Sequence, residues 1–251
     1  DEVQYQLGIL YIKTKQPRKA IAVYKQYLSK GYKTHTEEML YQLGYLYIET
    51  KHHKNAINSF EEYLSKGYKT HADEVQYQLG FLYIKNKQPK KAIAVYEQYL
   101  SGEVKEHSAV TQLNLGSLYL ETKQPFLALA AFENARQYPQ YRQNIELLQT
   151  LKVLYQETAS EAKYIKFLKE VAADSKLTEN DRHEFQTQLF LKYYDQNNCG
   201  KFISELGKNP GYLKYSKNSN LENWHHFIFL RGSCNFEKQS WSEARTDLRE
   251  V

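Results

Sequence analysis

Three histidines recur at a constant interval, and imidazole nitrogens are common ligands of zinc. His35, His71 and His107 are each 36 residues apart, so each occupies the same position in one copy of a repeating unit. Neighbouring helical units pack roughly 8–10 Å apart, whereas two ligands of one zinc ion must each lie about 2 Å from it. The pairs at 52–53 and 225–226 are adjacent residues, which do not share a helix face. We therefore predict no metal site, and we interpret the histidine series as an edge feature inherited by duplication.

Catalytic motifs are absent from the sequence. It contains no glycine-rich phosphate loop, no His-Glu-x-x-His, no Gly-x-Ser-x-Gly and no Cys-x-x-Cys. The carboxylates are spread as expected for solvated helix faces, and no pair stands out as an acid and a base. We predict no catalytic residue, no enzyme activity and no cofactor.

The two cysteines, Cys199 and Cys234, are too few for a disulfide scaffold. Two buried thiols are the favoured interpretation, and a bridge between adjacent repeats is the alternative. The cysteine content leaves the redox compartment open.

The elements that carry these residues follow a period of 36. A Leu-Gly pair, a tyrosine three residues after the glycine and a later alanine all recur at this spacing. A fixed period in this range indicates a stacked repeat array. Segments 1–30 and 73–102 agree at 25 of 30 positions, which indicates recent duplication. The recurring glycines are Gly8, Gly44, Gly80 and Gly116, and the alanines are Ala20, Ala56, Ala92 and Ala128.

Each repeat is predicted to form two helices. In residues 1–30, apolar residues at helical spacing lie on both sides of an interruption at Lys15-Gln16-Pro17. Pro17 suits the first turn of the second helix, where its missing N–H needs no partner. Gly31 and Gly67 follow second helices, where a left-handed C-terminal cap belongs. The unit is therefore a helix–turn–helix.

This pattern resembles the tetratricopeptide repeat family. The resemblance lies in Leu-Gly-x-x-Tyr of the first helix, the alanine of the second helix, and an aromatic residue four positions after that alanine. It covers residues 1–140 as four repeats, and the Lys-Gly-Tyr-Lys-Thr-His connectors are similar to those of Sel1-like repeats. The bulky Tyr27, Tyr63 and Tyr99 and a unit two residues longer than usual depart from the family pattern. The resemblance implies an all-α, right-handed superhelical solenoid of stacked antiparallel helix pairs.

Beyond residue 140 the repeat signal weakens. We predict degenerate helix pairs over 141–220 with a long loop near 207–220, and a further repeat over 221–251 that breaks off within a helix. About seven pairs result. The first repeat begins without a cap and the last is incomplete, so we expect a fragment of a longer repeat protein.

The first helices of repeats 1 to 3 are apolar nearly all round, and such a helix must be covered on every face. In tetratricopeptide arrays the extra positions line a concave groove, so the resemblance implies a binding channel for an apolar peptide or helix. The alternative is that tight packing buries these residues within the protein. The fourth repeat is less aromatic at the matching positions, which hold Leu113, Ser117 and Leu120. The groove residues are Tyr5, Ile9, Ile12, Tyr41, Tyr45, Ile48, Tyr77, Phe81 and Ile84.

The connectors between repeats offer a basic edge that could attract phosphate, anionic lipid or an acidic protein. A solvated lysine edge that maintains solubility is the favoured alternative. The net charge of +5 over 251 residues is modest, and without an arginine-rich face we expect no nucleic-acid partner. No apolar stretch is long enough to span a membrane. The edge residues are Lys30, Lys33, Lys66, Lys69 and Lys105.

The sequence thus predicts a non-enzymatic scaffold that binds a protein or peptide partner. Two alternatives remain: a structural arm or spacer of a bacterial envelope, secretion or motility assembly that docks through its basic edge, and a peptide-sensing regulator. Self-association through the terminal repeats is also open. The composition fits a bacterial protein, and analogy with repeat-built envelope scaffolds favours an extracytoplasmic location without excluding the cytoplasm.

Overall fold

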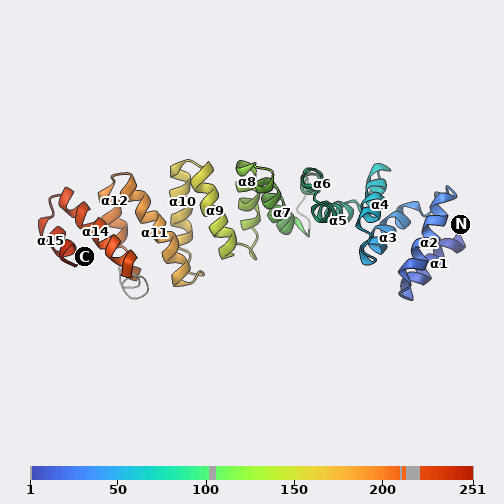
Figure 1. Cartoon of the computed structure of the whole chain (residues 1–251), viewed down its shortest axis with the longest axis horizontal. Helices are drawn as coiled ribbons and strands as arrows, with labels where there is room; N and C mark the ends of the chain where they lie inside the picture. The colour runs from blue at the N-terminus through green and yellow to red at the C-terminus, as the bar shows by residue number, and fades with distance from the viewer. Residues whose placement is uncertain (1, 102–105, 210, 213–220, 251) are drawn as a thin grey trace. The chain divides into compact units, whose positions relative to one another are not determined.

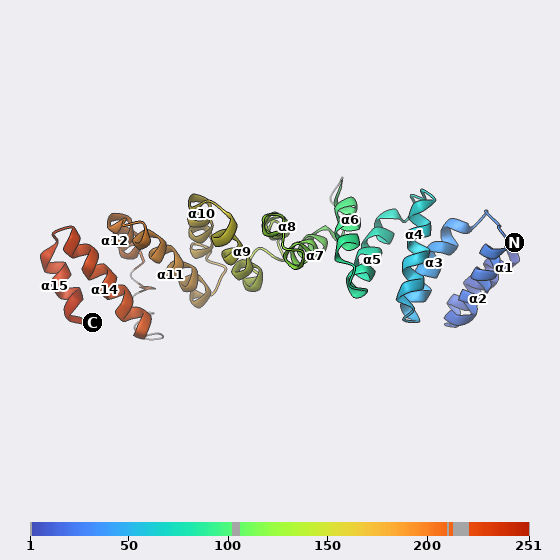
Figure 2. The ribbon, with the colours of Figure 1, turned by 45° about the horizontal axis from the view of Figure 1, so that its top comes forward.

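The computed structural model describes residues 2–101, 106–209, 211–212 and 221–250. In these residues it contains fourteen α-helices and no strand. The contacts divide the chain into two compact units, residues 1–138 and 139–251. The helices form seven antiparallel pairs, so the predicted all-α solenoid of about seven pairs is confirmed (Figures 1 and 2).

The first unit holds the four regular repeats. Each first helix packs against the second helix of its own repeat, and α3, α5 and α7 also pack against the second helix of the repeat before them. The pairs are α1 (Glu2–Lys13) with α2 (Pro17–Ser29), α3 (Thr36–Glu49) with α4 (His53–Ser65), α5 (Ala72–Lys85) with α6 (Pro89–Leu100), and α7 (Ser108–Glu121) with α8 (Pro125–Arg136).

Small residues set the distance between the two helices of a pair. Gly44 of α3 lies directly under the ring of Phe60 of α4, and a Cβ atom at position 44 would overlap that ring. Gly8, Gly80 and Gly116 meet the aromatic ring of their own pair in the same way. The glycine and the aromatic residue therefore form one packing unit, which explains why they recur together.

The helix ends follow the predicted local rules. Proline is the first residue of α2, α6 and α8. Gly31 and Gly67, just after α2 and α4, have φ of 74° and 73°, the left-handed conformation that glycine adopts without strain.

The second unit holds the degenerate pairs and is built around aromatic residues. Phe190, Phe202 and Phe227 are buried and in mutual ring contact. Tyr212 lies within the segment that the sequence predicts as a loop, yet it is 2% exposed and packs against Phe190. Gly207 of that segment ends α12, and residues 210 and 213–220 lie outside the described residues. The helices are α9 (Ile145–Thr158), α10 (Glu161–Ala172), α11 (Glu179–Asp195), α12 (Cys199–Gly207), α14 (Leu221–Glu237) and α15 (Trp241–Glu250).

A disulfide joins Cys199, the first residue of α12, to Cys234 near the end of α14. The Cα atoms are 5.1 Å apart, within the range that a disulfide requires. The favoured interpretation of two buried thiols is therefore wrong. The repeat pattern fades between the two cysteines, so the sequence gives no register that would bring them together.

Candidate functional site

The predicted groove residues lie on the same face of three successive first helices, α1, α3 and α5. Eight of the nine are half-buried, and Phe81 is 43% exposed. They stand at matching positions of each helix because the repeats share one register. The structure therefore brings them together as a stripe that is partly accessible and partly covered by the protein itself.

The covering groups at three of these positions are the recurring histidines. The imidazole ring of His35 stacks on the ring of Tyr5, with centroids 4.0 Å apart and planes 5° apart. The rings of Tyr41 and His71 stack at 4.0 Å, and those of Tyr77 and His107 at 4.1 Å. Each histidine directly precedes or caps the first helix of the following repeat, so each stack joins two repeats.

A carboxylate completes each stack. His35 Nε2 lies 2.7 Å from Glu2 Oε2, His71 Nε2 lies 3.4 Å from Glu38 Oε2, and the third histidine lies 3.6 Å from Glu74 in the same arrangement. At 2.7 Å the contact of His35 is a hydrogen bond, in which the carboxylate oxygen of Glu2 accepts and the imidazole Nε2 donates. We call this arrangement of glutamate, tyrosine and histidine the Glu–Tyr–His clasp; it occurs three times in the first unit.

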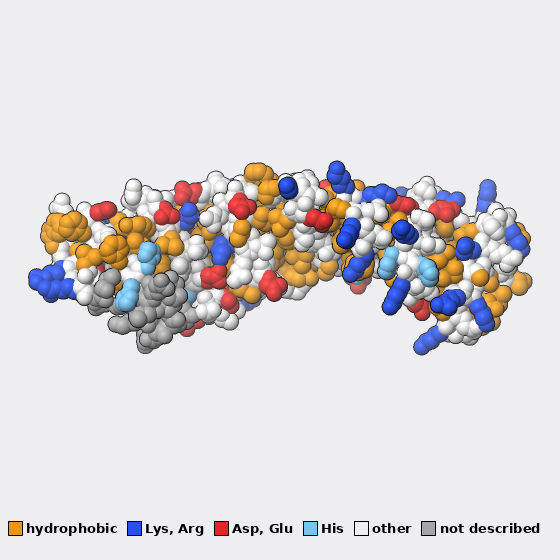
Figure 3. All heavy atoms as spheres, viewed as in Figure 1, with side chains coloured by type: hydrophobic (Ala, Val, Ile, Leu, Met, Phe, Trp, Pro, Cys, Tyr) orange, Lys and Arg blue, Asp and Glu red, His pale blue; other side chains and the backbone are white. Residues whose placement is uncertain are grey.

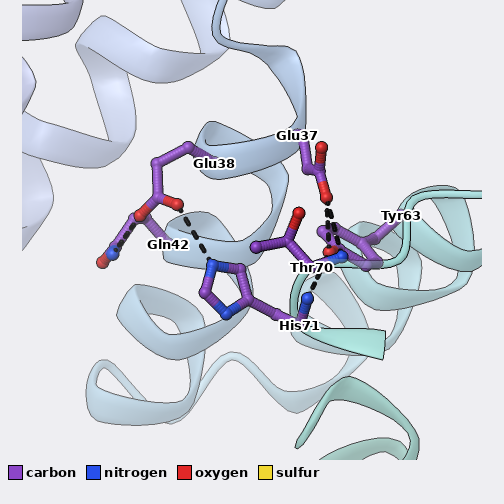
Figure 4. Close-up of polar contacts among 6 residues, drawn as sticks. All are labelled: Glu37, Glu38, Gln42, Tyr63, Thr70 and His71. Atoms are coloured by element: carbon purple, nitrogen blue, oxygen red, sulfur yellow. Dashed lines mark hydrogen bonds and ion pairs between the residues drawn. The ribbon is translucent and has the colours of Figure 1, made fainter. Parts of the chain in front are cut away.

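A second network of hydrogen bonds fixes the backbone at His71, the histidine of the second clasp (Figure 4). The hydroxyl of Tyr63 donates to Glu37 Oε1 at 2.9 Å and accepts from the backbone N–H of His71 at 2.8 Å. The N–H of Thr70 donates to the same carboxylate oxygen at 3.2 Å. Hydrogen bonds from Thr70 and Tyr63 lower the pKa of Glu37, and burial, with a smaller contribution from Glu37, raises the pKa of Tyr63 to about 12. The connector is thus held at both its side chains and its backbone.

Tyr45 in the middle of the stripe is also engaged. Its hydroxyl donates to Glu74 Oε1 of the next repeat at 2.6 Å, and its ring meets Phe60 edge-on. Burial, followed by the hydrogen bond to Glu74, raises the pKa of Tyr45 well above its ordinary value. Phe81 takes the equivalent position in α5 and lacks a hydroxyl, which leaves it the most exposed member of the stripe.

The basic edge predicted on the connectors is exposed at Lys30, Lys33, Lys66 and Lys69. Lys66 forms an ion pair with Glu62 at 3.5 Å. Lys105 lies outside the described residues. The first two connectors lead into helices whose first turns are acidic, at Glu37-Glu38 and at Asp73-Glu74, so the lysines there lie near carboxylates in the sequence.

The role of the histidines is the main feature that sequence reasoning missed. Each histidine follows its stacked tyrosine by 30 residues, so the constant offset was visible. An offset alone does not say which rings touch, because that depends on how tightly the repeats stack. In the described part of the chain, no group of three or more histidine, cysteine or carboxylate residues could hold a metal ion.

Matches to known families agree with this architecture. Residues 37–65 and 73–101 match one model of the tetratricopeptide repeat, and residues 2–33 match another. No curated protein matches the chain. Within the described residues, no helix is both long and apolar enough to cross a membrane.

Solved structures share the fold at low sequence identity. The chain resembles YrrB, described as a TPR protein with an unusual peptide-binding site, at 18% identity over 77% of this chain and 90% of that one, with a TM-score of 0.51. It resembles a chain of the Naa15/Naa10 complex bound to HypK-THB at 16% identity over 99% of this chain and 36% of that one, with a TM-score of 0.61. A tetratricopeptide repeat protein from Parabacteroides merdae matches at 13% identity over 99% of this chain and 91% of that one, with a TM-score of 0.50.

The repeat period, the glycine–aromatic packing, the family matches and the shared fold agree, and this architecture is that of a protein-interaction scaffold. Residues 2–33, 37–65 and 73–101 are tetratricopeptide repeats, and the chain shares the fold of tetratricopeptide repeat proteins.

Proposed function

We propose that this protein is a non-enzymatic scaffold that binds an apolar peptide or helix along the stripe formed by α1, α3 and α5. The observation that carries the proposal is the shared register of the nine apolar and aromatic residues on α1, α3 and α5, among which Phe81 is 43% exposed. Aromatic side chains give much contact area for few rotatable bonds, which is why they dominate binding hot spots.

The Glu–Tyr–His clasps hold three tyrosines of the stripe in fixed positions. Tyr5, Tyr41 and Tyr77 are held against the next repeat by their histidines, so their rings are already ordered before a partner arrives. Binding to an ordered surface costs less conformational entropy. The tyrosines then form a rigid part of the binding surface. Phe81 and the half-buried Ile48 and Ile84 supply the apolar contacts to the partner.

The peptide-binding description of the structurally similar YrrB supports a peptide as the kind of partner. An extended segment or an amphipathic helix would fit a stripe of apolar residues repeated along successive helices. Contacts of this kind lose little strength when salt is added, because they do not depend on exposed charges.

The test is a selection from a library of displayed random peptides on the immobilised chain, followed by binding measurements at low and high salt. We expect the enriched peptides to carry apolar anchors and to lose affinity about tenfold or more for Phe81→Ser, since truncating a central aromatic residue typically costs more than 1 kcal/mol. Phe126→Ser, which removes another exposed aromatic residue of the first unit, is the matched control and should bind normally.

The groove would be contradicted if Phe81→Ser and Phe126→Ser lost equal peptide affinity, or if the selected peptides bound only at low salt. Far-UV circular dichroism of both variants checks that helicity is retained. Salt-sensitive binding that depends on Lys33 and Lys69 would instead favour docking through the connector edge.

A further inference from the structure

The turn between the two helices of each repeat carries a lysine in an unfavourable backbone conformation. Lys15, Lys51, Lys87 and Lys123 have φ of 54°, 62°, 55° and 59°. This left-handed region is uncommon for residues other than glycine and asparagine, because the Cβ atom crowds the following carbonyl oxygen. In the second unit the α11–α12 and α14–α15 turns use Asn197 and Gln239 in the same region. The first unit therefore keeps a lysine at all four turns where glycine would be less strained, and strain of this kind points to a role for the side chain.

The same turns gather further positive charge, which we call the turn edge. All its basic side chains are exposed, and the segments 13–19, 49–55, 85–91 and 121–127 contain only two acidic residues, Glu49 and Glu121. Lys91 pairs with Glu61 at 3.1 Å, and Lys85 lies over the ring of Phe81. Blue side chains are spread over the N-terminal pairs in Figure 3. The members are Lys13, Lys15, Arg18, Lys19, Lys51, Lys54, Lys85, Lys87, Lys90, Lys91 and Lys123.

The turn edge differs from the connector edge in its balance of charge. The first two connectors lead into the acidic first turns of α3 and α5, whereas α7 and the second helices α2, α4, α6 and α8 have no acidic residue in their first turn. A row of cations with few carboxylates among them attracts an anionic surface more strongly than an evenly mixed row does.

The fourth repeat changes this edge from basic to apolar at two positions. Phe126 is 68% exposed and Leu127 is 46% exposed. The equivalent dipeptides of the first three repeats are Arg18-Lys19, Lys54-Asn55 and Lys90-Lys91, all polar and exposed. Two large apolar side chains are exposed at positions that are otherwise polar, which favours a partner with an apolar layer next to its charges.

We propose that the turn edge at the α5–α6 and α7–α8 turns docks on the surface of an anionic lipid bilayer. Lys87, Lys90 and Lys123 meet the headgroup phosphates, while Phe126 and Leu127 enter the boundary between headgroups and acyl chains. This combination of cations with exposed apolar residues is the one that holds proteins at membrane surfaces.

A nucleic acid fits these observations less well. It would favour bidentate arginines and aromatic platforms for bases, and the turn edge has one arginine, Arg18, and one exposed aromatic residue. An acidic protein would account for the lysines without giving a role to the Phe126-Leu127 pair. The lipid surface accounts for both, and it uses an edge that is distinct from the apolar stripe of the proposed scaffold.

The experiment is cosedimentation of the full chain with vesicles of phosphatidylcholine alone and of phosphatidylcholine with phosphatidylglycerol. We expect binding to the anionic vesicles only. Lys87→Glu with Lys90→Glu should weaken it by about tenfold or more, because each lysine near an anionic surface contributes most of a tenfold factor. The matched control, Lys33→Glu with Lys69→Glu, makes the same change in net charge on the connector edge and should weaken it much less.

The apolar pair is tested separately by Phe126→Ser with Leu127→Ser, which should remove the binding that remains at high salt. Phe229→Ser, which removes an exposed aromatic residue of the second unit, is its control and should leave vesicle binding unchanged. Peptide binding by the Phe126→Ser with Leu127→Ser variant should be retained, so failure of this proposal is distinguishable from failure of the groove. Three results would overturn the proposal: no binding to anionic vesicles, equal loss from the two charge variants, or binding of single-stranded DNA or an acidic peptide with the same lysine dependence but no vesicle binding.

Discussion

The disulfide between Cys199 and Cys234 leads to a quantitative prediction for the second unit. The two residues are 35 apart in sequence, and the bridge joins α12 to α14. A cross-link restricts the unfolded chain, and the entropy of closing a loop of this length corresponds to roughly 4 kcal/mol at 25 °C. Most single-domain proteins are stable by only about 5–15 kcal/mol, so reduction should remove a large part of the stability of this unit.

The chain provides its own probe for the measurement. Its two tryptophans, Trp224 and Trp241, both belong to the second unit, so tryptophan fluorescence reports the unfolding of that unit alone. We expect urea unfolding followed by fluorescence to shift to lower urea when the wild-type protein is reduced. Cys199→Ala with Cys234→Ala should unfold at about the same urea concentration as reduced wild type.

The control is the double variant with and without reductant, which should give identical curves. Free thiols detected in the folded, air-oxidised protein would refute the bridge itself. A disulfide that is present but whose reduction leaves the fluorescence transition unchanged would refute the loop-entropy reasoning. Because stable disulfides form in oxidising compartments, a confirmed bridge would also support an extracytoplasmic location.

Two further predictions concern the first unit. Gly44→Ala should destabilise it by about 1–3 kcal/mol, because the new methyl group would overlap the ring of Phe60. The higher helix propensity of alanine alone would instead stabilise it by about 1 kcal/mol. The sign of the stability change, measured by urea unfolding followed by circular dichroism, therefore decides between the two effects. Hydrogen bonds from Thr70 and Tyr63 hold the pKa of Glu37 below its ordinary 4.5, so its contribution to stability is present above pH 4.5 and is lost as the pH falls through the folded-state pKa. Urea midpoints measured against pH should therefore fall less steeply below pH 4.5 in Glu37→Gln than in wild type, and parallel curves would contradict the role given to this carboxylate.

The regular repeats were predictable because their signals are local. The 36-residue period, the prolines that begin second helices and the caps at Gly31 and Gly67 each depend on a few neighbouring residues, and all lie where the sequence indicates. The glycine–aromatic pair of each repeat also lies within one helix pair, 16 residues apart, so copies of the motif reveal it. Helix pairing and the family follow from these signals.

The candidate site was predictable only in part. The register of the stripe follows from helix periodicity, so the nine residues do share a face. Their accessibility does not follow, because it depends on what the next repeat places over each of them. His71 covers Tyr41, whereas Phe81, at the position of Tyr45, lies 43% exposed. The groove itself stays a prediction until a partner is measured.

The sequence by itself determined the repeat, its two helices and the family, since these rest on contacts between residues close along the chain. Only the tertiary structure decided which rings stack in the Glu–Tyr–His clasps, that the two cysteines join, and that Phe126 is left in water while neighbouring aromatic residues are buried. These outcomes depend on the distance and rotation between successive helix pairs. That geometry arises from the packing of many side chains together, and no single motif encodes it.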